Sequence, residues 1–173
     1  MRKGLGVFFI IVFILTSTVC YVSGDNKNEL TKKEKVNLYF SDKETLNLLS
    51  IKTEVTYDGN SIEKKIVEKL KKDSKDKKYD YIRTIGPDIT LLSLETRDGT
   101  AYVNFSSENL NGGSAEETLM IDSIVLSLTE LKHISKVQFL IDGEIEESLM
   151  GHISIKEPFD REDVTSKYKS IKN

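Results

Sequence analysis

The sequence pattern with the most chemical interest is Gly112-Gly113-Ser114, which stands directly before a long run of helical spacing. Glycine-rich turns at a helix start can bind phosphate, because backbone N–H groups and the positive end of the helix face the anion. Such sites usually include a lysine that reaches the phosphate, and this turn has none nearby. Glu116 and Glu117 in the first turn would also repel an anion. The pattern therefore predicts no nucleotide site.

A helix cap accounts for the same residues. Ser114 and Glu117 have the spacing of a capping box, in which each side chain accepts a hydrogen bond from the other residue's backbone N–H. We expect Ser114 to cap the helix and the two glycines to form the turn before it.

Few other residues are spaced for catalysis. His133 and His152 are the two histidines, and no metal-binding or nucleophile motif includes either of them. Glu146 and Glu147 could serve as an acid/base pair only in a cleft, and on a strand they would point apart. The single cysteine, Cys20, excludes an intrachain disulfide and a cysteine-based zinc site. We predict that the protein is not an enzyme and needs no cofactor or metal.

The overall charge argues against a nucleic-acid partner. The chain has a formal net charge of −3 and no tryptophan among its 173 residues. Nucleic-acid binding usually requires a basic surface or aromatic side chains on which bases stack. We expect no nucleic-acid binding.

The first 24 residues form an export leader. Arg2 and Lys3 precede an apolar run from Leu5 to Leu15, and small and polar residues follow. The leader could be cleaved before Asp25, it could be cleaved and lipidated at Cys20, or it could remain as a membrane-spanning helix. Attachment to the outer face of the cytoplasmic membrane is favoured over secretion.

Two charged segments are candidate interaction surfaces. Lys65, Lys69 and Lys72 lie on the polar face of a predicted helix at 61–73, where lysines continue to Lys78. The lysines could contact an anionic polymer or lipid, although interspersed acids favour an ordinary solvated face. The turn at Asp142-Gly143 begins an acidic hairpin that could form a second contact patch.

The remaining patterns predict the fold that carries these surfaces. Strands are expected at 36–40 and 46–57, at 89–97 and 100–106 around the turn Asp98-Gly99, and at 136–141. A second helix, 115–131, has an apolar stripe wide enough for burial against a sheet. We predict a single two-layer α+β domain, with a mixed or antiparallel sheet and two helices on one face. Its expected boundaries are a leader at 1–24, a polar tether at 25–35, the domain at 36–158 and a charged tail at 159–173.

Several of these segments together resemble the GerMN domain, a family of sporulation and spore germination proteins of Gram-positive bacteria. The resemblance spans roughly residues 36–158 and is most specific in "VNFS" (103–106), "GGS" (112–114), "LTE" (128–130) and "VQFLIDG" (137–143). The closing "EPFDRE" (157–162) also resembles the usual end of the family. It implies a fold like the ring-building domains of secretion systems. It also implies an exported, membrane-attached protein without known catalysis, whose partners are envelope proteins of a sporulation or germination assembly or further copies of itself. The shared residues occupy turn, cap and core positions, so no functional residue is transferred from the family.

Overall fold

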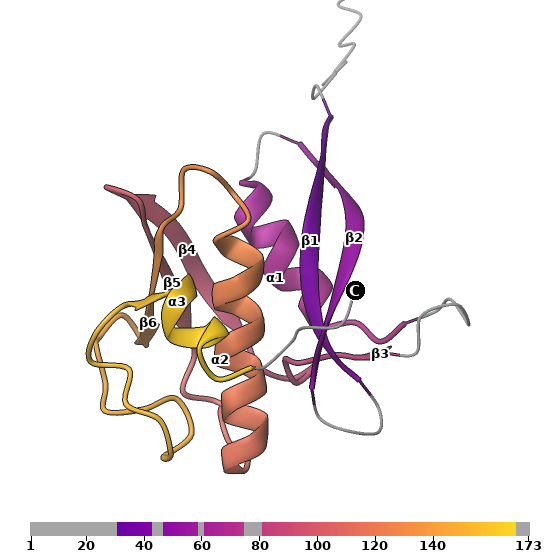
Figure 1. Cartoon of the computed structure of the whole chain (residues 1–173). Coiled ribbons are helices and arrows are strands. Elements are labelled where there is room, and N and C mark those ends of the chain that lie inside the picture. Colours follow the sequence, from indigo (N-terminus) through magenta and orange to yellow (C-terminus); the bar gives the residue numbers. More distant parts are fainter. Residues whose placement is uncertain (1–30, 43–46, 59–60, 75–80, 169–173) are drawn as a thin grey trace, which may run out of the picture.

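A computed structural model describes residues 31–42, 47–58, 61–74 and 81–168 (Figure 1). The leader, Cys20 and most of the predicted tether lie outside these residues, as do Lys75, Lys77 and Lys78. The order of elements is β-β-α-β-β-β-α-β-β-α. The α+β class predicted from the sequence is confirmed.

The first sheet is built on a long hairpin. β1 (Lys32–Asp42) pairs antiparallel with β2 (Leu48–Tyr57), and the short β3 (Tyr81–Ile82) pairs with the end of β1. The hairpin begins four residues earlier than predicted, because Lys32 pairs with Tyr57 and the Lys33 ammonium lies 2.8 Å from the Glu54 carboxylate. The expected tether therefore ends before Lys32.

The second sheet contains the predicted Asp-Gly hairpin. β4 (Leu91–Arg97) and β5 (Thr100–Phe105) are joined by Asp98 and Gly99, whose positive φ angles of 49° and 77° fit the tight turn. β6 (Lys136–Ile141) pairs parallel with β5, and β7 (Phe159–Asp160) pairs antiparallel with β6.

The strands thus form two sheets, where the sequence suggested one. β1 is the middle strand of the first sheet, and next to its short pairing with β3 the backbone N–H of Tyr39 donates a hydrogen bond to Ser127 Oγ on the second helix. This edge of β1 therefore contacts a helix at Tyr39 and a strand at Ser41 and Asp42.

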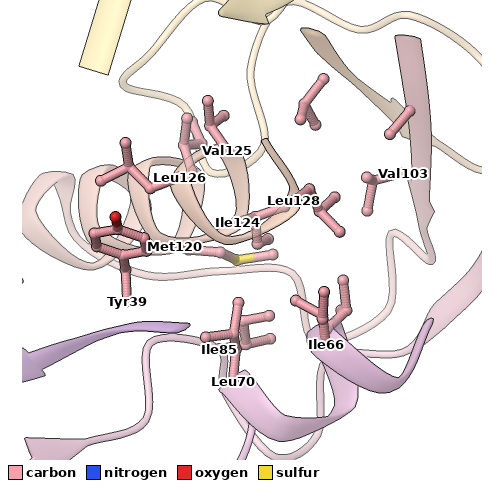
Figure 2. Packing of buried hydrophobic residues seen from close by; sticks show 14 of the residues in the cluster. Tyr39, Ile66, Leu70, Ile85, Val103, Met120, Ile124, Val125, Leu126 and Leu128 are labelled. Carbon is pink, nitrogen blue, oxygen red and sulfur yellow. The ribbon is translucent and has the colours of Figure 1, made fainter. Parts of the chain in front are cut away.

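The two longer helices lie between the sheets in Figure 1. α1 (Ile62–Leu70) is capped by Ser61 and packs on the β1–β2 hairpin, while α2 (Ser114–Leu128) contacts β1, β6 and α1. Every α2 residue from Leu119 to Leu128 is buried, which is typical of a central helix. Figure 2 shows the α1 side chains Ile66 and Leu70 facing Met120 and Ile124 of α2.

The C-terminal segment is part of the folded domain, although a charged tail was predicted from residue 159. β7 pairs with β6, α3 (Arg161–Thr165) follows, and Val164 is fully buried. Lys167 and Tyr168 both bond to Asp122 of α2. The many charged residues of this segment suggested an exposed tail. The segment is folded because several of its charged and polar side chains bond to other parts of the domain.

Candidate interaction surfaces and the polar contacts that hold them

The lysine stripe lies beside a groove at the C-terminal end of α1. Lys69 and Lys72 line this groove, which has a volume of about 530 Å³, whereas Lys65 pairs with Glu68 at 3.2 Å. Ile51 and Tyr81 form the accessible part of its floor. We name this feature the basic groove.

The basic groove carries an excess of positive charge. Its two carboxylates already have partners: Glu54 binds Lys33 at 2.8 Å, and Asp73 binds Arg83 at 2.6 Å. Among the residues that the structure describes, no side-chain hydrogen bond or ion pair satisfies Lys69 or Lys72. Both ammonium groups are therefore available to an anionic partner.

The Asp142-Gly143 turn forms as predicted, but these two residues hold the turn in place. Asp142 (φ 49°) accepts hydrogen bonds from the Ser107 N–H at 3.3 Å and 3.4 Å, and the Gly143 N–H donates to Asn104 Oδ1 at 2.9 Å. Both contacts lie next to the end of β5. The groups exposed to a partner are those that follow the turn.

Beyond the turn, residues 144–152 form a loop in place of the expected hairpin, and we name this segment the acidic loop. Glu144 makes a single bridge to Ile141, and no strand follows it directly among the described residues. The edge of β6 pairs with β7 at Lys136 and Val137. The side-chain amide of the next residue, Gln138, donates a hydrogen bond to the Ile155 carbonyl. Glu144, Ile145 and Glu146 are all exposed.

The buried carboxylate of Glu117 fixes the far side of this loop. Glu117 is fully buried and accepts hydrogen bonds from the backbone N–H groups of Met150 at 2.9 Å and His152 at 2.8 Å. The His152 ring Nδ1 lies 3.0 Å from the same carboxylate. Glu117 therefore has a structural role, and the predicted capping box with Ser114 is wrong.

The start of α2 is capped one residue earlier than predicted. Gly113 is the N-cap, and its N–H donates to the Glu116 carboxylate at 2.8 Å. Ser114 is the first helical residue, and its side chain is exposed. The carboxylate of Glu116 thus occupies the position at the helix end that a phosphate would need.

The sequence did not reveal an Arg161 cluster that joins the C-terminal segment to the first strand. The Arg161 guanidinium donates to Glu130 Oε1 at 2.8 Å and to the Tyr39 hydroxyl at 2.6 Å. It also donates to the Leu126 carbonyl at 3.0 Å, and Asn37 donates to the second Glu130 oxygen. Burial raises the pKa of Tyr39, the Arg161 charge opposes that rise, and the Glu130 charge adds to it. "EPFDRE" includes this arginine, which was the available signal.

Two further acid groups of the interior are also engaged. Asp122 is fully buried and accepts from Lys167 Nζ at 2.9 Å and the Tyr168 hydroxyl at 2.8 Å. Burial raises the pKa of the Asp122 carboxyl, and Lys167 and Tyr168 act against this rise. Glu63 lies 2.7 Å from His133 Nε2. Each histidine thus contacts a single carboxylate that belongs to the structural core.

No cluster of three or more His, Cys, Asp or Glu side chains suited to a metal ion occurs among the described residues. None of the helices in the described part has the length and apolarity needed to cross a bilayer.

The sequence of this chain matches a known protein family. The model of the Germane family, described as sporulation and spore germination, matches residues 37–147. The spore germination protein GerM of Bacillus subtilis is 31% identical over 83 residues, which cover 47% of this chain and 23% of that protein. The chain thus spans about a quarter of this curated relative.

Solved structures share the fold at low sequence identity. The first GerMN domain of B. subtilis GerM matches with a TM-score of 0.56 at 23% identity, covering 75% of this chain and 99% of that one. Its tandem GerMN domains match with a TM-score of 0.54 at 21% identity over 82% and 49% of the two chains. A candidate lipoprotein from Clostridium perfringens matches with a TM-score of 0.52 at 24% identity over 80% and 95%. Because the family model covers more than half of its residues, the chain belongs to the Germane family of sporulation and spore germination domains.

Proposed function

We propose that this protein is a non-catalytic, membrane-attached domain that acts outside the cytoplasm and binds other proteins in a sporulation or germination assembly. One observation carries the proposal: the buried carboxylates of α2 and the Arg161 guanidinium bond to other segments of the domain, whereas unpaired charge lies on the surface. Glu117, Asp122 and Arg161 each bond to neighbouring segments of the domain. Lys69, Lys72 and the acidic loop face outward.

Family membership gives the biological setting of the proposal. The family is one of sporulation and spore germination, and the matching B. subtilis protein is named a spore germination protein. A scaffold acts through its surface, so a domain of this family need not contain a catalytic group.

The leader and one relative support membrane attachment. A positively charged start followed by an apolar run directs export. The name of the C. perfringens protein, whose structure is similar, describes a candidate lipoprotein. Cys20 stands where lipidation could anchor the chain to the outer face of the membrane.

Deletion of the gene in its spore-forming host tests this function. We expect fewer heat-resistant or germinating spores, with recovery when the full-length protein is restored. Cross-linking in sporulating cells should join the protein to other envelope proteins. A deletion strain that sporulates and germinates normally, together with cross-links only to wall polymer, would contradict the scaffold role and favour a polymer-binding module that uses the lysines between Lys64 and Lys78.

A further inference from the structure

The basic groove and the acidic loop are complementary surfaces of one molecule. The groove offers the unpaired ammonium groups of Lys69 and Lys72 beside an accessible apolar floor at Ile51. A protein segment that fits it should carry carboxylates on either side of an aliphatic side chain. The loop sequence Glu144-Ile145-Glu146 has this pattern.

Ile145 is exposed to an extent that its surroundings do not explain. With 53% of its surface accessible, it is one of two large hydrophobic residues that are exposed among the described residues, and it lies between acids. Exposed aliphatic side chains are individually common. An isoleucine with a carboxylate on each side is a more specific feature, because it can fill an apolar pocket while its neighbours pair with cations.

Hydrogen bonds and an ion pair within the domain already order the acidic loop. Glu117 fixes its far end through Met150 and His152, and Asp142 fixes its near end through Ser107. Glu147 lies between these two ends of the loop. Its carbonyl accepts a hydrogen bond from the Ile155 N–H at 3.0 Å, and its side chain pairs with Lys156. A loop that is already ordered loses less conformational entropy when it docks.

The two surfaces lie on different sides of the domain. In Figure 1 the β1–β2 hairpin that floors the groove lies at the right, and the loop that follows β6 lies at the lower left, with α2 between them. A loop fixed at both ends cannot reach the groove of its own chain. A contact between unlike surfaces of two copies is heterologous, so it can be repeated from copy to copy.

We propose that the acidic loop of one copy docks in the basic groove of a second copy. Ile145 contacts the apolar floor near Ile51, and Glu144 and Glu146 pair with Lys69 and Lys72. The proposal rests on the proposed role as a protein-interaction domain and deepens it by naming the partner.

Site-specific photocross-linking of the full-length chain in membranes tests this contact. Two differently tagged copies are co-expressed, with p-benzoylphenylalanine in place of Ile145 in one of them. We expect a cross-link between the tags, mapped by mass spectrometry to β2 or α1 of the second copy. The matched control places the cross-linker at Leu92, which is 50% exposed on β4, and should give no such product.

Charge reversal supplies the second arm of the test. Lys69→Glu with Lys72→Glu in the receiving copy should lower the cross-link yield at least about tenfold, because like charges then oppose. Glu144→Lys with Glu146→Lys in the other copy should restore it. Lys132→Glu with Lys136→Glu, two exposed lysines outside the groove, should leave the yield unchanged.

The outcomes separate this proposal from the function on which it rests. A cross-link from Ile145 to another protein, or to none, overturns self-association while the sporulation role is still judged by the deletion strain. Restoration of the yield by the reversed pair supports the contact even if that strain sporulates normally. Reversed pairs that accumulate normally but do not restore the yield contradict the proposed pairing.

Discussion

The Glu117 carboxylate lies 2.8 Å from the backbone nitrogen of His152 and 3.0 Å from its ring Nδ1. These contacts join a fully buried acid on the central helix to a loop more than thirty residues away in the chain. The carboxylate satisfies backbone groups that would otherwise lose a partner. Glu117 therefore anchors the end of the acidic loop at Met150 and His152.

The first prediction concerns this contact. Glu117→Ala should lower the free energy of unfolding by about 2–4 kcal/mol, since it removes hydrogen bonds to a buried charged acceptor and leaves a cavity. Glu117→Gln, which keeps one acceptor oxygen, should cost less. Urea unfolding gives the free energies, and amide hydrogen exchange at Met150 and His152 should accelerate. Unchanged exchange at these two amides in Glu117→Ala would contradict the anchoring role.

A second prediction concerns the C-terminal segment. Arg161→Ala should cost about 1–2 kcal/mol, because its bonds to Glu130, Tyr39 and the Leu126 carbonyl are lost at a half-exposed site. Arg161→Lys keeps the charge but cannot reproduce the forked contacts, so it should recover only part of that loss. Thermal or urea unfolding measures both. Equal stability of the wild type and Arg161→Ala would contradict a stabilising role for these Arg161 contacts.

The pH dependence of stability should reveal the buried Asp122. Burial raises its folded-state pKa above the ordinary value of 3.8, so the folded protein binds the proton more tightly than the unfolded chain does. This carboxyl therefore favours folding most at low pH, and its contribution declines as pH rises from about 3.8 through the raised pKa.

Asp122→Asn isolates that contribution, because the amide does not titrate. The difference in unfolding free energy between the wild type and the Asp122→Asn variant should shift in favour of the variant as pH rises through this window. Urea unfolding at a series of pH values measures the difference. A difference that is flat with pH, or that shifts toward the wild type, would contradict a raised pKa.

The start of α2 provides a prediction that reverses the one made from sequence. Ser114→Ala should change stability by less than about 0.5 kcal/mol, since the exposed serine is not the cap. Glu116→Ala should cost about 0.5–1 kcal/mol by losing its bond to the Gly113 N–H. Gly113→Ser should be stabilising, because φ is −84° there and serine is a favoured N-cap. Urea unfolding of the three variants measures these changes, and a larger loss in Ser114→Ala than in Glu116→Ala would restore the serine cap.

Nucleotide binding at this turn has its own test. Neither ATP nor GTP should shift the melting temperature of the protein, because Glu116 already accepts from the helix start. A saturable shift that Glu116→Ala enhances would show that an anion competes for this position.

The sequence correctly predicted those helices, strands and turns that are specified by residues close together in the chain. The Asp98-Gly99 turn and the helix predicted at 61–73 depend on backbone conformation and local side-chain spacing, and both formed as expected. The contact between β1 and α2 includes the bond from Tyr39 to Ser127, which lies 88 residues away. No local pattern contains that information.

The candidate surfaces were also predictable only in their local features. The spacing of Lys65, Lys69 and Lys72 predicted one helical face, and α1 ends at Leu70, before Lys72. The groove beside Lys69 and Lys72 also needs a floor from β1 and β2. Glu117 was misread for a related reason. Its spacing from Ser114 suits a cap, whereas its burial and its bonds to Met150 and His152 come from tertiary packing.

The last prediction addresses how the protein reaches its site of action. We expect the full-length protein to fractionate with membranes, because its leader combines an export signal with Cys20 and an apolar run almost long enough to span. Cys20→Ala separates the two anchors. Release from the membrane would indicate lipidation, since that thiol is the only one available, whereas retention would indicate a spanning helix. Mass spectrometry of the wild-type N-terminus provides the check: a soluble product beginning at Asp25 would exclude both anchors and leave the domain to act as a secreted protein.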